Sequence, residues 1–347
     1  MKELFDFEKI QLQVKKQQMR RNIWLVFFVT LITLMINWGL PKIVNAFFYD
    51  PTASNELTSI DSYIVNRQIN NELTTQNQFL SRYEITPKGY GNYAITEIYR
   101  NLAQNQTLTK TYAINRNQIK ENQPSLPENT DVLFMERFRD SSSNMFTESD
   151  LYKEQLLEKI KELPKSTEII STVIFGEDLT LDELAEWQTY NLGDGEILWT
   201  AVRSSIPTSE QDYIPLGFAN GFSSVLPSEQ NFEQSFLEKY PFLSPFHNTQ
   251  AQITDYSEAQ QQAAHFTSML QYLQTQGDFL ALEPDYGRKL LSSGQIADTL
   301  AYVEQQGVNT YGVSIRTNVD QLITLLQTGE NVLAVRVVET TLFNLYR

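Results

Sequence analysis

One uncharged apolar segment near the N-terminus constrains this chain more than any other feature. No Asp, Glu, Lys or Arg occurs between Arg21 and Lys42, and residues 23–40 read IWLVFFVTLITLMINWGL. A helix needs about 20 apolar residues to cross the apolar core of a bilayer. The segment therefore predicts a transmembrane helix over 23–40, with a short tail on one side and most of the chain on the other.

The residues around this segment predict its orientation. Trp24 and Trp38 lie near its two ends, where amphipathic rings favour the membrane interface. Basic residues are concentrated before it, since Lys15, Lys16, Arg20 and Arg21 precede it and only Lys42 follows closely. Of these, we expect Arg20, Arg21 and Lys42 to share the membrane interface with the two tryptophans. Because positive charge favours the inner side, residues 1–22 are predicted to be a cytoplasmic tail and the remainder to lie outside the cell membrane.

A cleaved signal peptide is the alternative to this anchor. Residues 44–46, Val-Asn-Ala, resemble a small-residue cleavage site. However, the apolar part of a signal peptide spans about 7–15 residues, which is shorter than this segment. Bulky side chains follow directly, at Phe47, Phe48 and Tyr49. The length of the segment favours an uncleaved anchor.

Composition and charge exclude several classes of protein. The 347 residues include no Cys, which excludes disulfides, Fe–S clusters, thiol nucleophiles and Cys-based zinc sites. With 41% hydrophobic residues the outer part has enough apolar material for a core. The tail holds six Lys/Arg and three Asp/Glu, a net charge of +3. Because the whole chain has a net charge of −15, the rest of it has a net charge of −18. An acidic outer part argues against nucleic acid as a partner and against direct adhesion to anionic lipid.

The tail has one coherent pattern. Leu4, Phe7, Ile10 and Val14 follow one another at spacings of three and four, which places them on one face of a helix. Such a face is a hypothetical binding surface for a cytoplasmic partner. The same pattern is typical of a basic amphipathic helix that lies on anionic lipid, and the sequence leaves both interpretations open.

Residues 41–149 are predicted to form a juxtamembrane outer region built around a β-hairpin. The polar stretch 62–79 predicts a weak stalk helix. A turn signal at 86–91 is followed by two strands, 92–100 and 108–114, that are expected to pair.

Residues 150–347 are predicted to form one outer α+β domain, a mixed or mainly antiparallel sheet with helices packed on it. Parallel pairing within its β-α-β units stays open. The last strand is rich in β-branched residues, so we expect it inside the sheet or covered on one face. The expected elements are a helix after a capping-box pattern at 147–150, strand 168–175, a helix capped by Thr180, strand 196–202, helices from Ser257 to Gly277 and over 292–306, strand 308–315, a helix from Thr317 to Gly329, and strand 332–338.

The sequence contains no recognisable catalytic motif. A Walker loop, Gly-x-Gly-x-x-Gly, His-Glu-x-x-His and Gly-x-Ser-x-Gly are all absent. His247 and His265 have no metal-ligand spacing, and His265 is expected to be packed or half-exposed on a helix. We therefore predict that the protein is not an enzyme and needs neither a metal nor another cofactor.

The densest group of carboxylates has a structural explanation. Glu177, Asp178, Asp182 and Glu183 lie close together, and a glycosidase needs two opposed carboxylates. Asp182 and Glu183 fall in the first turn of a predicted helix, where the helix dipole and a capping box account for them.

Three blocks of the second half carry a resemblance to a known family. In words, they are a strand followed by Thr-Leu-Asp-Glu-Leu and an aromatic strand, a long helix with a Tyr-Leu pair, and a Tyr-Gly-Val-Ser-Ile-Arg-Thr strand followed by a helix and a last strand. They cover residues 172–184 with 196–199, residues 266–273, and residues 311–317 with 320–322 and 332–335. With these blocks in this order after a single span, the second half of the chain resembles the C-terminal domain of the Firmicute sigma-factor regulator family. Members of that family are membrane proteins often regarded as anti-sigma factors. Residues 20 to 115 are similar to the family's N-terminal segment.

The resemblance implies a single-pass membrane regulator of an extracytoplasmic-function sigma factor in a Gram-positive cell, with an outer domain that senses or binds something. Its implied partners are that sigma factor or an intermediary membrane protein. One departure matters, because a typical anti-sigma factor holds sigma through a substantial cytoplasmic domain, whereas this tail has 22 residues without Cys or His. A membrane-tethered binding or scaffold protein with an inert tail stays open as the alternative, and an outer-surface enzyme is the least favoured. The sequence indicates neither the signal nor the oligomeric state.

Overall fold

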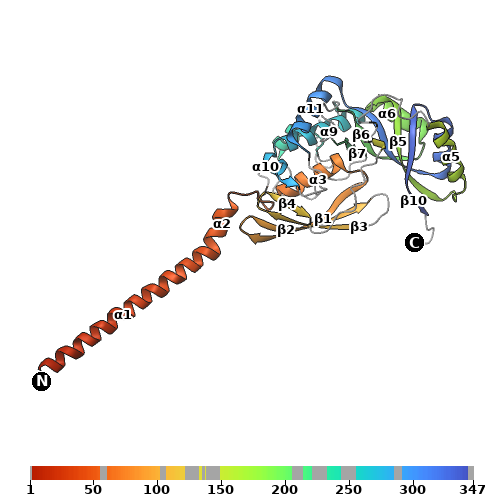
Figure 1. Ribbon diagram of the computed structural model, residues 1–347. Helices are drawn as coiled ribbons and strands as arrows, with labels where there is room; N and C mark the ends of the chain where they lie inside the picture. Colours follow the sequence, from red (N-terminus) through yellow and green to blue (C-terminus); the bar gives the residue numbers. More distant parts are fainter. Residues whose placement is uncertain are drawn as a thin grey trace.

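The computed structural model consists of an N-terminal helical rod and a body with two β-sheets (Figure 1). The structure describes residues 2–54, 61–101, 107–121, 133–134, 137, 149–204, 214–220, 233–243, 255–284 and 291–342. The predicted α+β class, with one apolar N-terminal helix followed by sheets and packed helices, is confirmed. His247 and the capping-box pattern over 147–148 lie outside the described residues.

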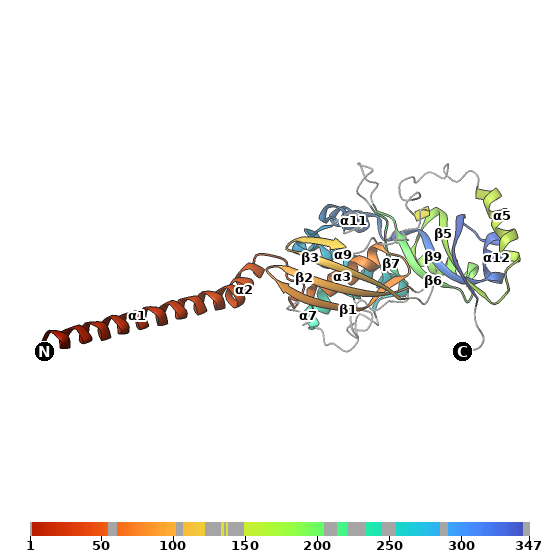
Figure 2. The ribbon, with the colours of Figure 1, turned by 60° about the horizontal axis from the view of Figure 1, so that its bottom comes forward.

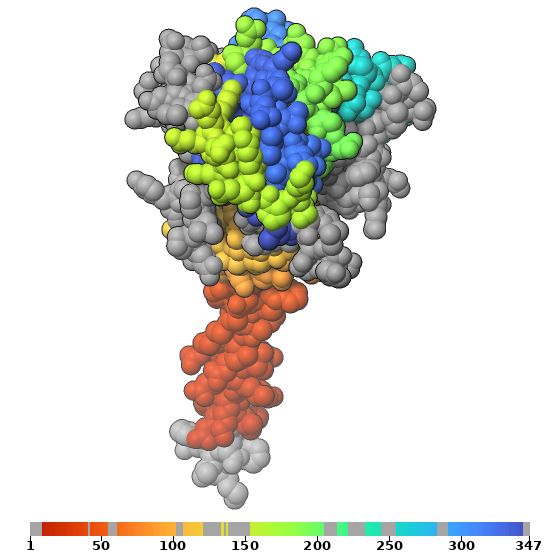
Figure 3. All heavy atoms as spheres, turned by 90° about the vertical axis from the view of Figure 1, so that its right-hand side faces the viewer, coloured from red at the N-terminus to blue at the C-terminus, as the bar shows by residue number. Residues whose placement is uncertain are grey.

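The rod is one long helix with an irregular end. Helix α1 (Lys2–Leu34) runs into a π-helical turn, η1 (Met35–Gly39), and then into α2 (Leu40–Asn45). It contains an 18-residue window with a mean hydropathy of 2.1, none of which is buried. By length and composition this helix can cross a membrane, and it extends beyond the predicted segment at both ends. Figure 3 shows it projecting clear of the body.

Polar side chains within the apolar part of the rod bond to the rod itself. Thr30 and Thr33 each donate a hydroxyl hydrogen bond of 2.8 Å to the carbonyl four residues earlier. The Asn37 amide donates to Thr33 O over 2.8 Å. These bonds satisfy polar groups that water cannot reach in a bilayer, so the side chains are compatible with a span.

Pro41 accounts for the π-helical turn. A proline ring collides with the carbonyl four residues earlier in a regular helix, which here belongs to Asn37, and proline has no N–H to donate. The turn directly before Pro41 lets the helix widen, and Leu40 donates its N–H to Met35 O. The rod therefore continues past Pro41 with one altered turn, as is common for π-bulges.

The first sheet has the strand order β1-β2-β3-β4-β8. The predicted hairpin is confirmed, because β2 and β3 pair antiparallel with Ile95 opposite Tyr112. Strand β8 comes from the second half of the chain and pairs parallel with β4, and neither strand was expected from the sequence. The bounds are β1 (Gln78–Gly89), β2 (Asn92–Asn101), β3 (Thr107–Asn115), β4 (Gln118–Glu121) and β8 (Glu283–Pro284).

The second sheet has the order β10-β5-β9-β6-β7, and every neighbouring pair in it is antiparallel. The prediction of a mainly antiparallel sheet is thus confirmed. The last strand was expected inside the sheet or covered on one face: β10 forms an edge and is not internal, but its first half is covered. The bounds are β5 (Thr167–Thr180), β6 (Glu196–Val202), β7 (Leu216–Ala219), β9 (Asn309–Asn318) and β10 (Val332–Leu342).

Two groups of helices pack on these sheets. Helices α5, α6 and α12 contact one another or the second sheet, whereas α9 and α11 pack together beside α3 and α10 (Figures 1 and 2). The bounds are α5 (Ser149–Lys161), α6 (Leu181–Asn191), α7 (Gln234–Lys239), α9 (Glu258–Gln274), α10 (Gly277–Leu280), α11 (Ser293–Gln306) and α12 (Val319–Thr328).

Complete capping boxes begin three of the described helices, and the Ser292 side chain caps a fourth, α11. The predicted caps Thr180 and Ser257 both form complete capping boxes. The cap of α12 is Asn318 and not Thr317, because the Asn318 side chain accepts from the N–H of Gln321 while Thr317 still belongs to β9. Helix α9 ends at Gln274, three residues before the predicted Gly277.

Helix α3 (Ser62–Thr74) is the largest departure from expectation. The sequence predicts a weak stalk helix here, but eleven of its 13 residues are buried. It packs against β1, β7 and α9, and Figure 1 shows it between the first sheet and α9. Its apolar residues join one hydrophobic core that extends into the second sheet. The predicted division at residue 149 stays a prediction, while the residues on its two sides share that core.

Candidate functional site

The rod is fixed to the body at two levels. Near its last turns, the Tyr90 hydroxyl in the β1–β2 turn donates a 2.8 Å hydrogen bond to Ile36 O. At its end, the N–H of Gly91 donates to the side chain of Asn45 over 2.6 Å. The chain then passes directly into the body, where the N–H of Tyr49 donates to Asn117 Oδ1 over 3.0 Å. The rod and the first sheet are thus joined by direct contacts.

Phe48 is the side chain that closes this junction. The Arg116 guanidinium lies over its ring, 5.5 Å from the centroid. On the other side, a Cβ atom at Gly91 would come within 2.7 Å of Phe48 Cδ2. Gly91 has a φ of +72°, a conformation that favours glycine. Only glycine therefore allows both the turn and the close approach of this ring.

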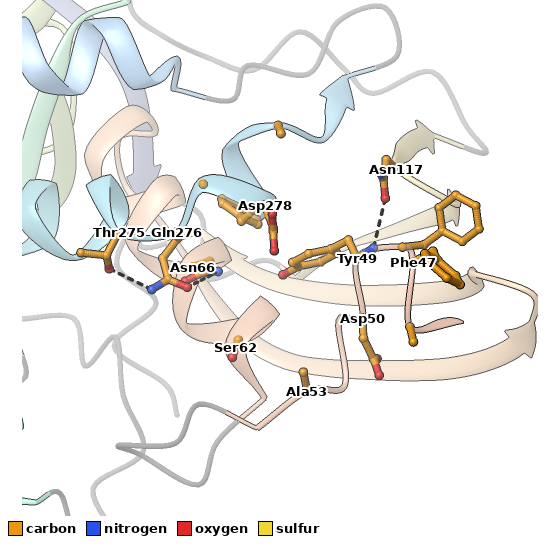
Figure 4. A pocket seen from close by; sticks show the side chains of 15 residues that line it. Phe47, Tyr49, Asp50, Ala53, Ser62, Asn66, Asn117, Thr275, Gln276 and Asp278 are labelled. Atoms are coloured by element: carbon orange, nitrogen blue, oxygen red, sulfur yellow. Dashed lines mark hydrogen bonds between the residues drawn. The ribbon is translucent and has the colours of Figure 1, made fainter. Parts of the chain in front are cut away.

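A cavity of about 490 Å³, the junction pocket, lies where the rod meets the body. Figure 4 shows that its walls come from the segment after α2, from the start of α3 and from the end of α9 with α10. Its lining residues are Ala46, Phe47, Phe48, Tyr49, Asp50, Ala53, Ser62, Asn66, Asn117, Thr275, Gln276, Gly277, Asp278, Phe279 and Ala281. It contacts both the end of the rod and the core helices, so an occupant there would touch both.

The charge of the pocket restricts what it can accept. Its two carboxylates are Asp50 and Asp278, and no Lys, Arg or His occurs among the described residues that line it. Asp50 is engaged by Thr52, whose N–H and hydroxyl donate to Asp50 Oδ1 over 2.9 and 2.7 Å. Asp278 lies at the exposed rim. Amide and hydroxyl groups beside aromatic rings suit a neutral or cationic ligand, while an anion would be repelled.

Tyr49 and Asn66 both line the pocket, and their side chains interact with each other. Asn66 is 1% exposed, and its amide donates weakly to Gln276 Oε1 over 3.4 Å. Burial raises the pKa of Tyr49 well above its ordinary value, so the hydroxyl stays protonated. In Figure 4 it is directed toward Asp278 and Asn66.

Helix α3 carries a buried ionic cluster behind the junction pocket. Arg67 Nε lies 3.4 Å from Glu97 Oε2 on β2, and both side chains are buried. The hydroxyls of Tyr63 and Tyr99 donate to the same carboxylate over 2.8 and 2.6 Å. Arg67 also lies over the rings of Tyr99 and Tyr112. These contacts replace water around both charges, which explains how a polar helix can be central to the core.

A second buried pair joins α3 to α9. Nε2 of His265 lies 2.8 Å from Oε1 of Glu72, and its Nδ1 lies 2.7 Å from the carbonyl of Phe242. The Glu72 carboxylate also accepts from the N–H of Ala219 on β7, over 3.1 Å. The expectation that His265 is packed is met in full, as it is completely buried. No sequence signal connects Glu72 with a residue 193 positions away.

The predicted tail and interface residues all lie on the rod. Ile10 and Val14 are exposed on α1, and the helix backbone also includes Leu4 and Phe7, whose side chains are outside the description. The predicted interface residues, Arg20, Arg21, Trp24, Trp38 and Lys42, are all exposed. Their roles stay predictions. The residues of the junction pocket were not identified from the sequence, because its walls come from segments far apart in the chain.

The carboxylate cluster found in the sequence is dispersed among structural contacts. Asp178 makes a two-pronged ion pair with Arg203, at 2.6 and 2.9 Å. Glu183 closes the capping box of α6, and its hydrogen bonds with Thr180 lower its pKa. These contacts account for both side chains without a substrate.

Comparison with known proteins gave no match to a family model, a curated protein or a solved structure. The resemblance to sigma-factor regulators therefore stays a prediction from the three sequence blocks.

Proposed function

We propose that the protein is a single-pass membrane regulator whose outer body binds a signal and whose short tail passes the change to a cytoplasmic partner. The observation that carries this proposal is the fixed junction between rod and body. Tyr90 and Gly91 hold the rod directly, Asn117 holds the segment that follows it at Tyr49, and the junction pocket lies against the same segment. A simple tether needs no such contacts, whereas a transmitter needs its binding site and its span to move together.

The orientation is part of this proposal, with the N-terminus in the cytoplasm and the body outside. The chain has no cysteine, so a thiol reagent labels a single-cysteine variant only at the introduced residue. Tyr190 is 85% exposed on the body, and Gln13 is exposed on the tail side of the rod. In intact cells, a membrane-impermeant maleimide should label Tyr190→Cys and leave Gln13→Cys unlabelled until the cells are opened. The reverse labelling would contradict the orientation.

The proposed partner is an extracytoplasmic-function sigma factor, reached directly or through another membrane protein. The resemblance supports this partner, and the predicted face of Leu4, Phe7, Ile10 and Val14 is the candidate contact. A buried side chain of this kind contributes about 1.5–3 kcal/mol. Losing two should weaken binding by about a hundredfold or more.

Deletion of the gene, followed by a transcript profile, tests this partner. A discrete group of transcripts controlled by one such sigma factor should change, and the full-length gene should restore it. The variant Phe7→Asp with Ile10→Asp should fail to restore it. The matched control, Lys15→Gln with Lys16→Gln, should restore it because those residues serve orientation and lipid contact. If the double Asp variant restores regulation, the contact runs through an intermediary membrane protein.

The alternative is a membrane-tethered binding or scaffold protein without contact to a sigma factor. It is favoured by the junction pocket itself, which lies outside the tail and needs no cytoplasmic partner to bind a ligand. The same transcript profile separates the two functions, because deletion of a scaffold should leave no sigma-dependent group of genes changed.

A further inference from the structure

The contact between Tyr90 and Ile36 lies at an unusual level of the rod. The uncharged run covers residues 22–41, and at about 1.5 Å per residue it spans about 30 Å, the thickness of a bilayer core. Ile36 lies five positions before the outer end of this run, or about 8 Å inside it. A residue of the body that reaches Ile36 therefore reaches the outer edge of the apolar layer.

The carbonyl of Ile36 needs this contact. In an α-helix it would accept from the N–H of Leu40, but that group is bonded to Met35 O. In a π-helix it would accept from residue 41, which is a proline and has no N–H. The Tyr90 hydroxyl supplies the missing donor over 2.8 Å. An unsatisfied carbonyl at the edge of a bilayer core is costly, so the bond should form most readily in the membrane.

The side chains around this contact have the composition of a membrane interface. Although its hydroxyl is bonded to Ile36, Tyr90 is still 40% exposed, and Trp38 and Phe47 are 76% and 78% exposed. Lys42 is exposed on the rod, and Lys88 is exposed at the end of β1. Aromatic rings and lysines with long apolar stems favour the headgroup level of a bilayer.

We infer that the β1–β2 turn, residues 87–91, is a membrane-contact surface that seats the body in the outer headgroup layer beside its own span. This inference rests on the proposed span and orientation. The partner is the lipid surface itself. The net acidity of the body disfavours wider adhesion to anionic lipid, so the contact is confined to this turn and the end of the rod.

Lipid-quenching of a fluorophore tests the seating with the full chain in phosphatidylcholine vesicles. An environment-sensitive dye is attached to Lys88→Cys, and separate vesicles contain lipids with a quencher at the top of the acyl chain, to probe residue 88, or at its end, to probe the middle of the span. Leu31→Cys, in the middle of the apolar run, is the positive control. Tyr190→Cys, on α6, is the negative control. Quenching at residue 88 should exceed that at residue 190 by roughly threefold or more, as expected for a group at the interface.

The controls separate this inference from the proposed function. Quenching at residue 31 without quenching at 88 would overturn the seating and leave the span intact. Absence of quenching at both positions would overturn the span, and the seating with it.

A second variant tests the role of the Tyr90 hydroxyl. Tyr90→Phe keeps the ring but removes the donor to Ile36, so it should reduce the quenching at Lys88→Cys by about half or more. Tyr83→Phe, in the strand β1 that leads into this turn, is the matched control and should leave the quenching unchanged. Equal quenching with Tyr90→Phe and with the unaltered Tyr90 would overturn the proposed dependence of seating on this bond.

Discussion

His265 and Glu72 form an ion pair inside the body, with Nε2 and Oε1 2.8 Å apart and side chains only 1% and 3% exposed. The other ring nitrogen of His265 faces the carbonyl of Phe242. Both neighbours of the ring are therefore hydrogen-bond acceptors, and an imidazole that satisfies both must carry two protons. The pair links α3 to α9, and through Ala219 it reaches β7 of the second sheet.

The stability of the body should fall as the pH rises. Burial alone lowers the pKa of His265, but the Glu72 carboxylate and the Phe242 carbonyl act against it, and the pKa lies above its ordinary value of 6.5. A group whose pKa is raised by folding contributes stability that is complete below the unfolded pKa and is lost through the folded one. Urea unfolding of the full chain in micelles, from about pH 6 to about pH 9, should show a falling free energy of unfolding.

Substitutions at this pair provide the control. His265→Gln should flatten the pH dependence over that range and cost about 3–5 kcal/mol, because it leaves the Glu72 carboxylate buried without a countercharge. One oxygen of that carboxylate, Oε2, already has no partner among the described residues. His265→Gln together with Glu72→Gln should cost less than His265→Gln alone. An unchanged pH dependence in His265→Gln would show that another group is responsible.

Arg67 is predicted to be essential to the fold. Arg67→Met leaves Glu97 charged in the core, so the free energy of unfolding should fall by about 3–5 kcal/mol. The matched control is Lys165→Met, which breaks an exposed ion pair with Asp320 at 3.2 Å. That change should cost at most about 1 kcal/mol. Thermal unfolding of the two variants measures the difference, and similar melting temperatures would contradict the buried role of Arg67.

Short-range signals explain what the sequence predicts correctly. The helix after Thr180 follows from a capping box whose bonds all lie within four residues, and the structure has that box. The strand 196–202 follows from a run of apolar residues and is found with the predicted bounds as β6. The long uncharged segment has no alternative to a helix, and its length is itself the signal.

Long-range contacts explain what the sequence does not predict. Helix α3 looks exposed because it contains Asn66, Arg67 and Glu72, yet their partners come from the first sheet, α9 and β7. Strand β8 has two residues and is specified only by its pairing with β4. The junction pocket joins residues 46–66 to residues 275–281, so no local pattern marks it.

Gly91 should be more sensitive to substitution than other glycines of the same conformation. Gly91→Ala strains a left-handed residue, at about 1–2 kcal/mol, and also forces the Phe48 ring away from its site. Gly193→Ala is the matched control, since its φ is +57° but nothing lies within 4 Å of the new methyl group. Urea unfolding should show the larger loss for Gly91→Ala. Proteolysis near residues 46–54 should accelerate in Gly91→Ala alone, and equal rates would contradict the role of Phe48 in closing the junction.

The last strand should be required for the second sheet although it forms an edge. Its first half buries Val332, Ala334 and Val335, and it pairs with β5 from Phe175 to Thr167. Truncation after Gly329 removes these core side chains and leaves the backbone N–H and C=O groups of β5 that bond to β10 without partners. The body should therefore lose its cooperative melt. Truncation after Val338 removes only the exposed end of β10 and should keep a cooperative melt near the full-length temperature. The thermal melts of the two truncated proteins, each with its rod and in micelles, are measured by circular dichroism and compared with that of the full chain. A cooperative melt after truncation at Gly329 would mean that the sheet is complete with β5 at its edge.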